Sequence, residues 1–148
     1  MGATTPAARD TARAVSQENI EIVRGAQEAF LAGDIETALD ILDPEIEWHA
    51  TIGGIDEGRV ARGRDEVVQA FADYFEVWER IDMSAERYIA AGPDDVVVFH
   101  HEVAKGRGSG VVVESESATI QTVRSGKIVR VRSYLDRQQA LEAAGVAE

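Results

Sequence analysis

The end of the chain constrains its fold more than any other segment. Residues 111–122 and 127–136 are rich in Val, Ile and Thr, and Ser125-Gly126 between them is typical of a hairpin turn. The chain begins, in contrast, with a segment of helical periodicity. A chain that opens in helices and closes in a long hairpin packs most easily when the sheet curls around the helices. Such a sheet forms a cup that can hold a small molecule.

Length and composition indicate one globular domain. The chain has 148 residues, of which 45% are hydrophobic, and no stretch approaches the roughly 20 apolar residues of a membrane span. The first ten residues lack the apolar core of a secretory signal. There is no cysteine, which fits a cytoplasmic location. We expect a flexible tail over residues 1–15, a single domain over 16–144 and a short tail over 145–148.

The net charge of −12 argues against nucleic acid as a partner, because phosphate binding needs clustered Lys and Arg. The local exception is Arg59, Arg62 and Arg64, which gather around one turn. Two interpretations are open for them: a solvated loop, or a clamp for an anion.

Periodicity divides the chain into elements. Helices are expected over 16–32, 35–42 and 64–80, a strand around 46–48, an irregular loop over 51–62, four strands over 85–91, 96–105, 111–122 and 127–136, and a helical turn over 137–144. Ser16 and Asp34 are the expected N-caps, and Pro44 ends the second helix. Asp136 is expected to cap the turn that follows the last strand.

Five sequence phrases in this order resemble the SnoaL-like branch of the nuclear transport factor 2-like superfamily. They are ENIEIVR at 18–24, AFLAGD at 29–34, LDPEIEW at 42–48, GRDE at 63–66 and SGKIVR at 125–130, together with Tyr134. The resemblance implies an α+β, conical fold in which a curved antiparallel sheet wraps around three N-terminal helices. It also implies a pocket at one end and a homodimer through the outer face of the sheet, a surface to which Phe99 and Val103 would contribute.

Relatives of this kind include polyketide cyclases, ketosteroid isomerases, limonene-1,2-epoxide hydrolase, scytalone dehydratase and binding domains without enzymatic activity. The fold does not choose among them, so the function must be argued from pocket residues.

The strand over 96–105 carries the strongest candidates for chemistry. Side chains alternate across a sheet, so His100 and Glu102 share one face with Val96 and Val98, while His101 points to the other. The epoxide hydrolase has a positively charged residue and an acid at this spacing, facing its pocket. In an apolar cavity Glu102 could accept a proton or activate water, with His100 assisting. A register slip of one residue would bring His101 inside instead, and a purely structural pair is the alternative.

Two departures from the relatives limit the mechanism. The epoxide hydrolase uses a second acid on its last strand, where this chain has Ser133. The base of ketosteroid isomerase would fall near Trp48 and its protonated acid near Thr119, and neither residue can do that work. What is left is a polar set of His100, Glu102, Thr119, Gln121 and Ser133.

Aromatic residues are expected to line the cup. Trp48 should point inward with Ile46, and a core position is its alternative role. The helix over 64–80 adds an aromatic stripe that forms either core or cavity wall: Phe71, Tyr74, Phe75 and Trp78.

No metal or cofactor is expected. The three histidines, His49, His100 and His101, lack helical spacing, and there is no dinucleotide fingerprint or nucleophile elbow. The sequence therefore predicts a pocket protein for a compact, partly apolar carbonyl or hydroxyl compound. It would act without a cofactor as an isomerase, cyclase or hydrolase, or serve as a non-catalytic ligand-binding or dimerisation domain.

Overall fold

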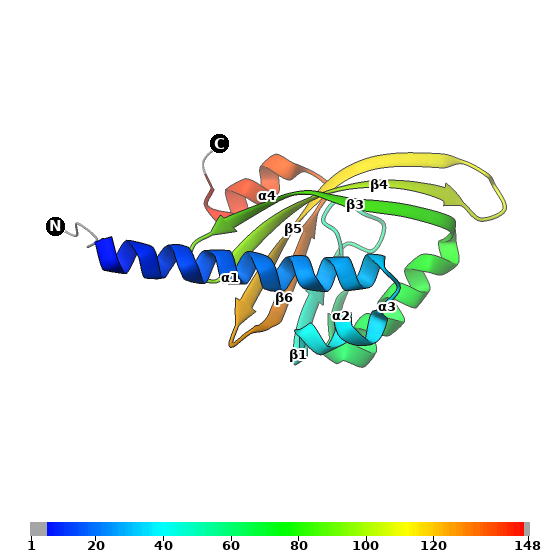
Figure 1. Cartoon of the computed structure of the whole chain (residues 1–148). Helices are drawn as coiled ribbons and strands as arrows, with labels where there is room; N and C mark the ends of the chain where they lie inside the picture. Colours follow the sequence, from blue (N-terminus) through cyan, green and yellow to red (C-terminus); the bar gives the residue numbers. More distant parts are fainter. Residues whose placement is uncertain (1–5, 147–148) are drawn as a thin grey trace.

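The computed structural model describes residues 6–146. Its elements are α1 (Pro6–Leu31), α2 (Ile35–Ile41), β1 (Leu42–His49), β2 (Val60–Arg62), α3 (Gly63–Val77), β3 (Trp78–Ala91), β4 (Asp95–Gly106), β5 (Val112–Arg124), β6 (Lys127–Tyr134) and α4 (Arg137–Ala144). The expected α+β fold with a curved sheet is confirmed (Figure 1).

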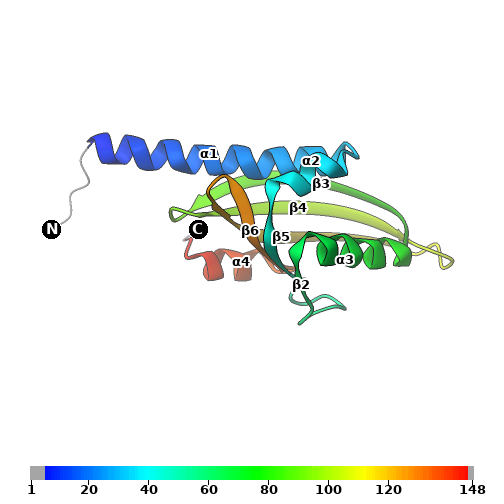
Figure 2. The same ribbon diagram turned by 90° about the horizontal axis from the view of Figure 1, so that it is seen from below.

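The six strands form one sheet in the order β2-β1-β6-β5-β4-β3. Every neighbouring pair is antiparallel except β1 and β6, which run parallel and so depart from the expected all-antiparallel sheet. The strands lie between α1 on one side and α4 on the other (Figure 2). We call the face toward α1 the inner face and the face toward α4 the outer face.

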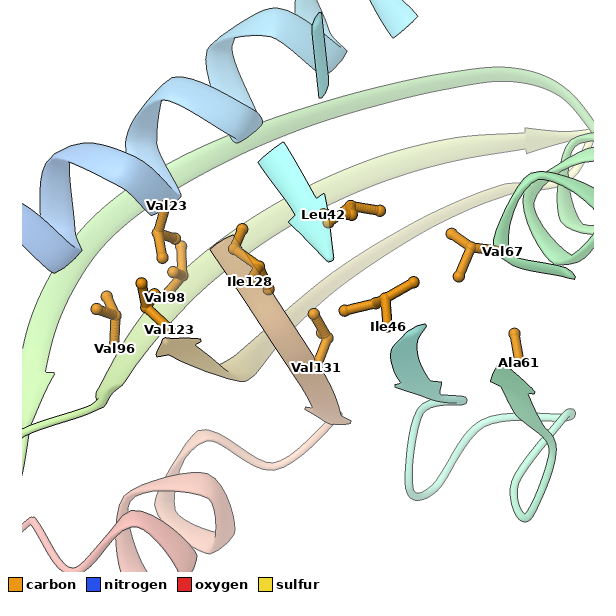
Figure 3. Packing of buried hydrophobic residues seen from close by; sticks show 10 residues of the cluster. All are labelled: Val23, Leu42, Ile46, Ala61, Val67, Val96, Val98, Val123, Ile128 and Val131. Atoms are coloured by element: carbon orange, nitrogen blue, oxygen red, sulfur yellow. The ribbon is translucent and has the colours of Figure 1, made fainter. Parts of the chain in front are cut away.

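Apolar residues cover both faces of the central strands. On the inner face, Val96, Val98 and Val131 belong to a cluster that also contains Val23 of α1 and Val67 of α3 (Figure 3). The outer-face cluster contains Val97, Ile120 and Tyr134 together with Ala140 and Leu141 of α4. Because β4 is covered from both sides, Val96, Val97 and Val98 are all fully buried.

Local sequence signals set several element ends. The side chain of Asp34 accepts the backbone N–H of Thr37 and caps α2, as expected. Asp136 accepts the backbone N–H groups of Gln138 and Gln139 and caps α4, also as expected. The turn between β5 and β6 has φ of 52° at Ser125 and 77° at Gly126, the left-handed conformation that a two-residue hairpin turn requires.

Three expected boundaries are wrong. Helix α1 begins at Pro6 and not at Ser16, because the residues that follow Pro6 are mostly good helix formers. Helix α3 ends at Val77, so Trp78 opens β3 instead of lying on the helix. Strand β3 is therefore twice as long as expected, because it pairs with β4 from Trp78↔Gly106 to Ala91↔Asp95. The expected tail over 1–15 lies partly in α1, and its residues 1–5 lie outside the described residues.

The segment 51–62, expected as loop throughout, contains the short strand β2. It pairs with β1 through Glu47↔Arg62 and His49↔Val60. Backbone pairing with an available strand edge formed this strand without any periodic side-chain pattern.

Candidate functional site

Strand β4 presents His100 and Glu102 on the inner face, as the alternation predicted. They share a face of β4 with Val96 and Val98, which pack in the inner cluster. His100 is opposite Ser117 of β5, and Glu102 is opposite Ser115. His101 lies on the outer face, where its Nε2 is 2.7 Å from Oε1 of Glu114. The register therefore brings His100, and not His101, to the inner face.

Glu102 is held by a tyrosine of α3. The Tyr74 hydroxyl lies 2.9 Å from Oε1 and 3.1 Å from Oε2 of Glu102, so it donates to the carboxylate. Burial raises the pKa of the Tyr74 hydroxyl, and the neighbouring Glu102 charge raises it further. Tyr74 consequently stays protonated at neutral pH and acts as a fixed donor.

His100 is part of a buried chain of polar side chains. Its Nε2 lies 3.0 Å from the Thr119 hydroxyl oxygen, which in turn accepts the Gln121 amide N–H at 3.0 Å. His100 is 5% exposed, and its Nδ1 is buried without a hydrogen-bond partner in the described structure. Burial, followed by the positive charge of Arg137, lowers the pKa of His100 to about 4. The imidazole is therefore neutral at pH 7.

The aromatic residues form one continuous cluster beside this polar set. Trp48 meets Phe71 edge-on with ring centroids 5.1 Å apart. Further ring contacts link Phe71 to Phe75, Phe75 to Tyr74, and Tyr74 to Trp78. Phe30 of α1 also joins, 5.3 Å from Phe71. The sequence carries no local sign of this contact, because nothing in the neighbourhood of Phe30 shows which helix it would face.

Most sequence-predicted residues are thus linked through space. The rings lead to Tyr74, Tyr74 holds Glu102, and His100 follows two residues earlier on the same face of β4. Ser133 joins this set through strand pairing, because it lies opposite Thr119. Its hydroxyl is 3.0 Å from that of Thr51, a contact that the irregular pattern of the 51–62 segment could not reveal.

Arg137 of α4, which sequence reasoning also missed, contacts β4 from the outer face. Its Nη2 donates to the backbone carbonyl of His100 at 2.8 Å, and its guanidinium carbon lies 4.8 Å from the centroid of the Phe99 ring. Helix α4 thereby covers part of the outer face that was expected to carry a dimer contact.

Two surface hollows of the described structure lie away from Glu102. One, of about 490 Å³, lies between α1 and the turns before β4 and after β5, with Asn19, Pro93 and Arg124 among its lining residues. The other, of about 320 Å³, lies between the 50–60 segment and β6. Ser133 and Arg59, one of the candidate anion-clamp arginines, line the second hollow; the other predicted catalytic and ligand-binding residues line neither. Trp48, Phe71 and Tyr74 are instead half-buried, and Phe75 is 38% exposed.

A protein-family model described as the SnoaL-like domain matches residues 23–131. The chain belongs to the SnoaL-like domain family. This membership supports small-molecule binding and names no reaction. No curated protein sequence matches this SnoaL-like protein.

Solved structures share the fold of this SnoaL-like protein. A nuclear transport factor 2-like protein from Burkholderia thailandensis E264 is 25% identical, with a TM-score of 0.73 over 84% of this chain and 95% of that one. TerC, co-crystallised with polyporic acid, is 24% identical, with a TM-score of 0.69 over 86% and 98%. A Mycobacterium tuberculosis protein in complex with estradiol-17beta-hemisuccinate is 15% identical, with a TM-score of 0.65 over 80% and 94%. They establish a nuclear transport factor 2-like fold.

The remaining polar candidates have separate roles. Arg59 pairs with Asp73, Arg62 pairs with Glu47, and Arg64 donates to the carbonyl of Leu42, so the three arginines have different protein partners. His49 Nε2 lies 2.6 Å from Glu47, on the opposite face of the sheet from His100. Within residues 6–146, no group of three or more His, Asp or Glu side chains is placed to hold a metal ion. None of the helices in this range combines the length and the hydrophobicity of a membrane span.

Proposed function

We propose that this SnoaL-like protein binds a compact, partly apolar carbonyl or hydroxyl compound on the inner face of its sheet, between the aromatic cluster and β4. Family membership supports small-molecule binding, and two proteins of the same fold were crystallised with small molecules. The half-buried rings of Trp48, Phe71 and Tyr74 offer an apolar wall. Glu102 and His100 supply polar groups next to that wall, an arrangement typical of ligand sites.

We further propose that Glu102 is the base of a proton-transfer reaction that needs no cofactor. The observation that carries this proposal is the pair of Tyr74–Glu102 contacts, 2.9 and 3.1 Å, which hold a carboxylate beside the aromatic wall. In the step, the C–H bond next to the ligand carbonyl breaks and its proton moves to Glu102. The C–H electron pair forms a C=C bond to the carbonyl carbon, and the C=O π pair moves onto the oxygen. Where the ligand already has a C=C bond beside the deprotonated carbon, return of the proton to the far carbon of that bond completes an isomerisation.

His100 is suited to the carbonyl end of such a ligand. Same-face neighbours on a strand lie about 6.6 Å apart, twice the rise of about 3.3 Å per residue. The two side chains therefore start close enough together on one face for a single compact ligand to reach both. A neutral imidazole with a free nitrogen can hydrogen-bond the oxygen while Glu102 meets the C–H group.

Hydrogen–deuterium exchange tests the proposal without knowledge of the natural substrate. Cyclohexanone and 2-tetralone are incubated with the protein in D₂O, and loss of their α-protons is followed by NMR against a buffer blank. We expect catalysed exchange that Glu102→Gln lowers by about 10²- to 10⁴-fold. Glu114→Gln is the matched control, because Glu114 pairs with His101 on the outer face. Exchange that both variants lose equally, or that Glu102→Gln retains, would contradict Glu102 as the base.

A non-catalytic ligand-binding domain is the second candidate. The position of both hollows away from Glu102 favours it. Titration of the same two ketones, followed by Trp48 and Trp78 fluorescence, separates the candidates. Saturable binding with exchange no faster than in buffer supports the binding domain. Absence of binding would overturn both proposals for the inner face.

We also propose a homodimer in the cytoplasm. Because α4 covers Phe99, the contact would use the uncovered part of the outer face near Val103 and the exposed Val112 beside it, which lies opposite Lys105. A chain of 16.1 kDa should then give about twice that mass by light scattering. Val112→Lys should shift the mass toward that of the monomer, and a monomeric wild-type protein at micromolar concentration would contradict the dimer.

A further inference from the structure

We infer that Thr119 and Gln121 are positioning residues that select the tautomer of His100 in which Nδ1 carries the proton and Nε2 does not. This inference rests on the proposed function for its consequence and on the buried hydrogen bonds for its argument. All three side chains are at least 92% buried, with exposures of 5% for His100, 8% for Thr119 and 6% for Gln121. Water is therefore largely excluded from the chain.

The direction of each hydrogen bond follows from a count of donors. The Gln121 amide nitrogen can only donate, so Thr119 Oγ1 accepts at 3.0 Å. The Thr119 hydroxyl then has one proton left, and its other partner in the described structure is His100 Nε2 at 3.0 Å. Either direction leaves one buried donor without a partner: Nδ1–H of His100 if Thr119 donates, or the Thr119 hydroxyl proton if His100 donates. Donation by His100 would also leave the Nδ1 lone pair unpaired, which adds a second buried unpaired group, so Thr119 donates to Nε2. A neutral imidazole with Nε2 as acceptor carries its single proton on Nδ1.

The consequence concerns what His100 offers to a ligand. Its Nδ1 is the buried nitrogen that has no partner, and in this tautomer it is a donor. A donor selects an oxygen that accepts: a carbonyl, or the enolate oxygen that forms when Glu102 removes a proton. Because the imidazole is neutral, it stabilises the growing charge through a hydrogen bond without giving up its proton. The opposite tautomer would offer a lone pair and would favour a ligand hydroxyl or amine.

Gln121 determines which way the two hydrogen bonds of Thr119 run. A side chain that accepts at this position would take the Thr119 proton, and Thr119 would then accept from Nε2–H of His100. Gln121→Glu is nearly the same shape and, when ionised, only accepts. This single change should therefore convert His100 from a donor to an acceptor at Nδ1.

Long-range ¹H–¹⁵N NMR of the ligand-free protein at pH 7 reads the tautomer directly. The signals of His100 are assigned by comparison with His100→Gln, and His49 and His101 serve as internal references. We expect a protonated Nδ1 and an unprotonated Nε2 in the wild type. Thr119→Val should increase the Nε2–H population, and Thr119→Ser, which restores the hydroxyl, should return the wild-type pattern. The tautomer of the Gln121→Glu variant is measured at a pH where the ¹³C chemical shift of the new carboxyl group shows that it is ionised.

The wild-type spectrum alone can overturn the inference, even if the variants fail to fold. The inference is wrong if His100 is found as the Nε2–H tautomer. It is also wrong if Thr119→Val leaves the ratio of the two His100 tautomers unchanged, because Thr119 and Gln121 would then not select the tautomer. These readouts need no ligand, so they are independent of the ketone experiments. If NMR finds the expected tautomer but the protein does not catalyse α-proton exchange, Glu102 is not the proposed base. The selection of the His100 tautomer by Thr119 and Gln121 then still holds.

Discussion

Burial of neutral His100 should make the stability of the protein depend on pH in a defined direction. Its pKa falls from 6.5 to about 4 on folding, so the unfolded chain binds the proton more tightly than the folded chain does. Stability from this group is fully present above pH 6.5 and is lost as the pH falls toward 4. At about 1.36 kcal/mol per pKa unit, the difference of about 2.5 units corresponds to about 3 kcal/mol.

Chemical denaturation at pH 7 and at pH 4.5, followed by the fluorescence of Trp48 and Trp78, measures this effect. Carboxylates also titrate in this range, so the informative quantity is the difference between wild type and His100→Gln at each pH. We expect the wild type to lose about 2 to 3 kcal/mol more than the variant on acidification. His101→Gln is the matched control, because His101 lies on the outer face in a partly exposed pair with Glu114.

The control should follow the wild type to within about 1 kcal/mol, as expected for an exposed ion pair. If wild type and His100→Gln lose stability in parallel between pH 7 and 4.5, the burial of a neutral imidazole is refuted. An NMR titration that finds His100 half-protonated near pH 6.5 in the folded protein would refute it independently.

Three further predictions concern stability. Ile46→Ala should cost about 2–5 kcal/mol and Ile46→Val about 0.5–1.5, because Ile46 is fully buried in the inner cluster; equal losses in urea denaturation would contradict close packing there. Asp136→Ala should cost about 1 kcal/mol by the same assay, because α4 loses its N-cap, whereas Asp136→Asn should retain most of it. Tyr74→Phe should lower the free energy of unfolding by about 1–2 kcal/mol, because it removes the donor to Glu102. No measurable change in stability would show that water replaces the Tyr74 hydroxyl without cost.

Patterns that depend on neighbours in sequence were readable before the structure was known. The caps at Asp34 and Asp136 and the turn at Ser125-Gly126 involve residues at most three positions apart. The alternation in β4 predicted correctly that His100 and Glu102 share a face, because the side-chain period of a strand is two wherever it pairs. The resemblance to known families supplied the fold, which the family match and the shared structures then established.

Contacts between distant residues were decided only by the tertiary structure. Trp78 continues a helical stripe in sequence, but pairing with Gly106 of β4 makes it the first residue of β3. Tyr74 meets Glu102 across 28 positions of sequence, and Arg137 reaches the carbonyl of His100 across 37. Residue types and local spacing thus determined most of the elements and the faces of β4, but not where α1, α3 and β3 begin or end. The hydrogen bonds that hold Glu102 and orient His100 depend on how a curved sheet brings separate elements together, because side-chain partners at such separations leave no periodic signal in the chain.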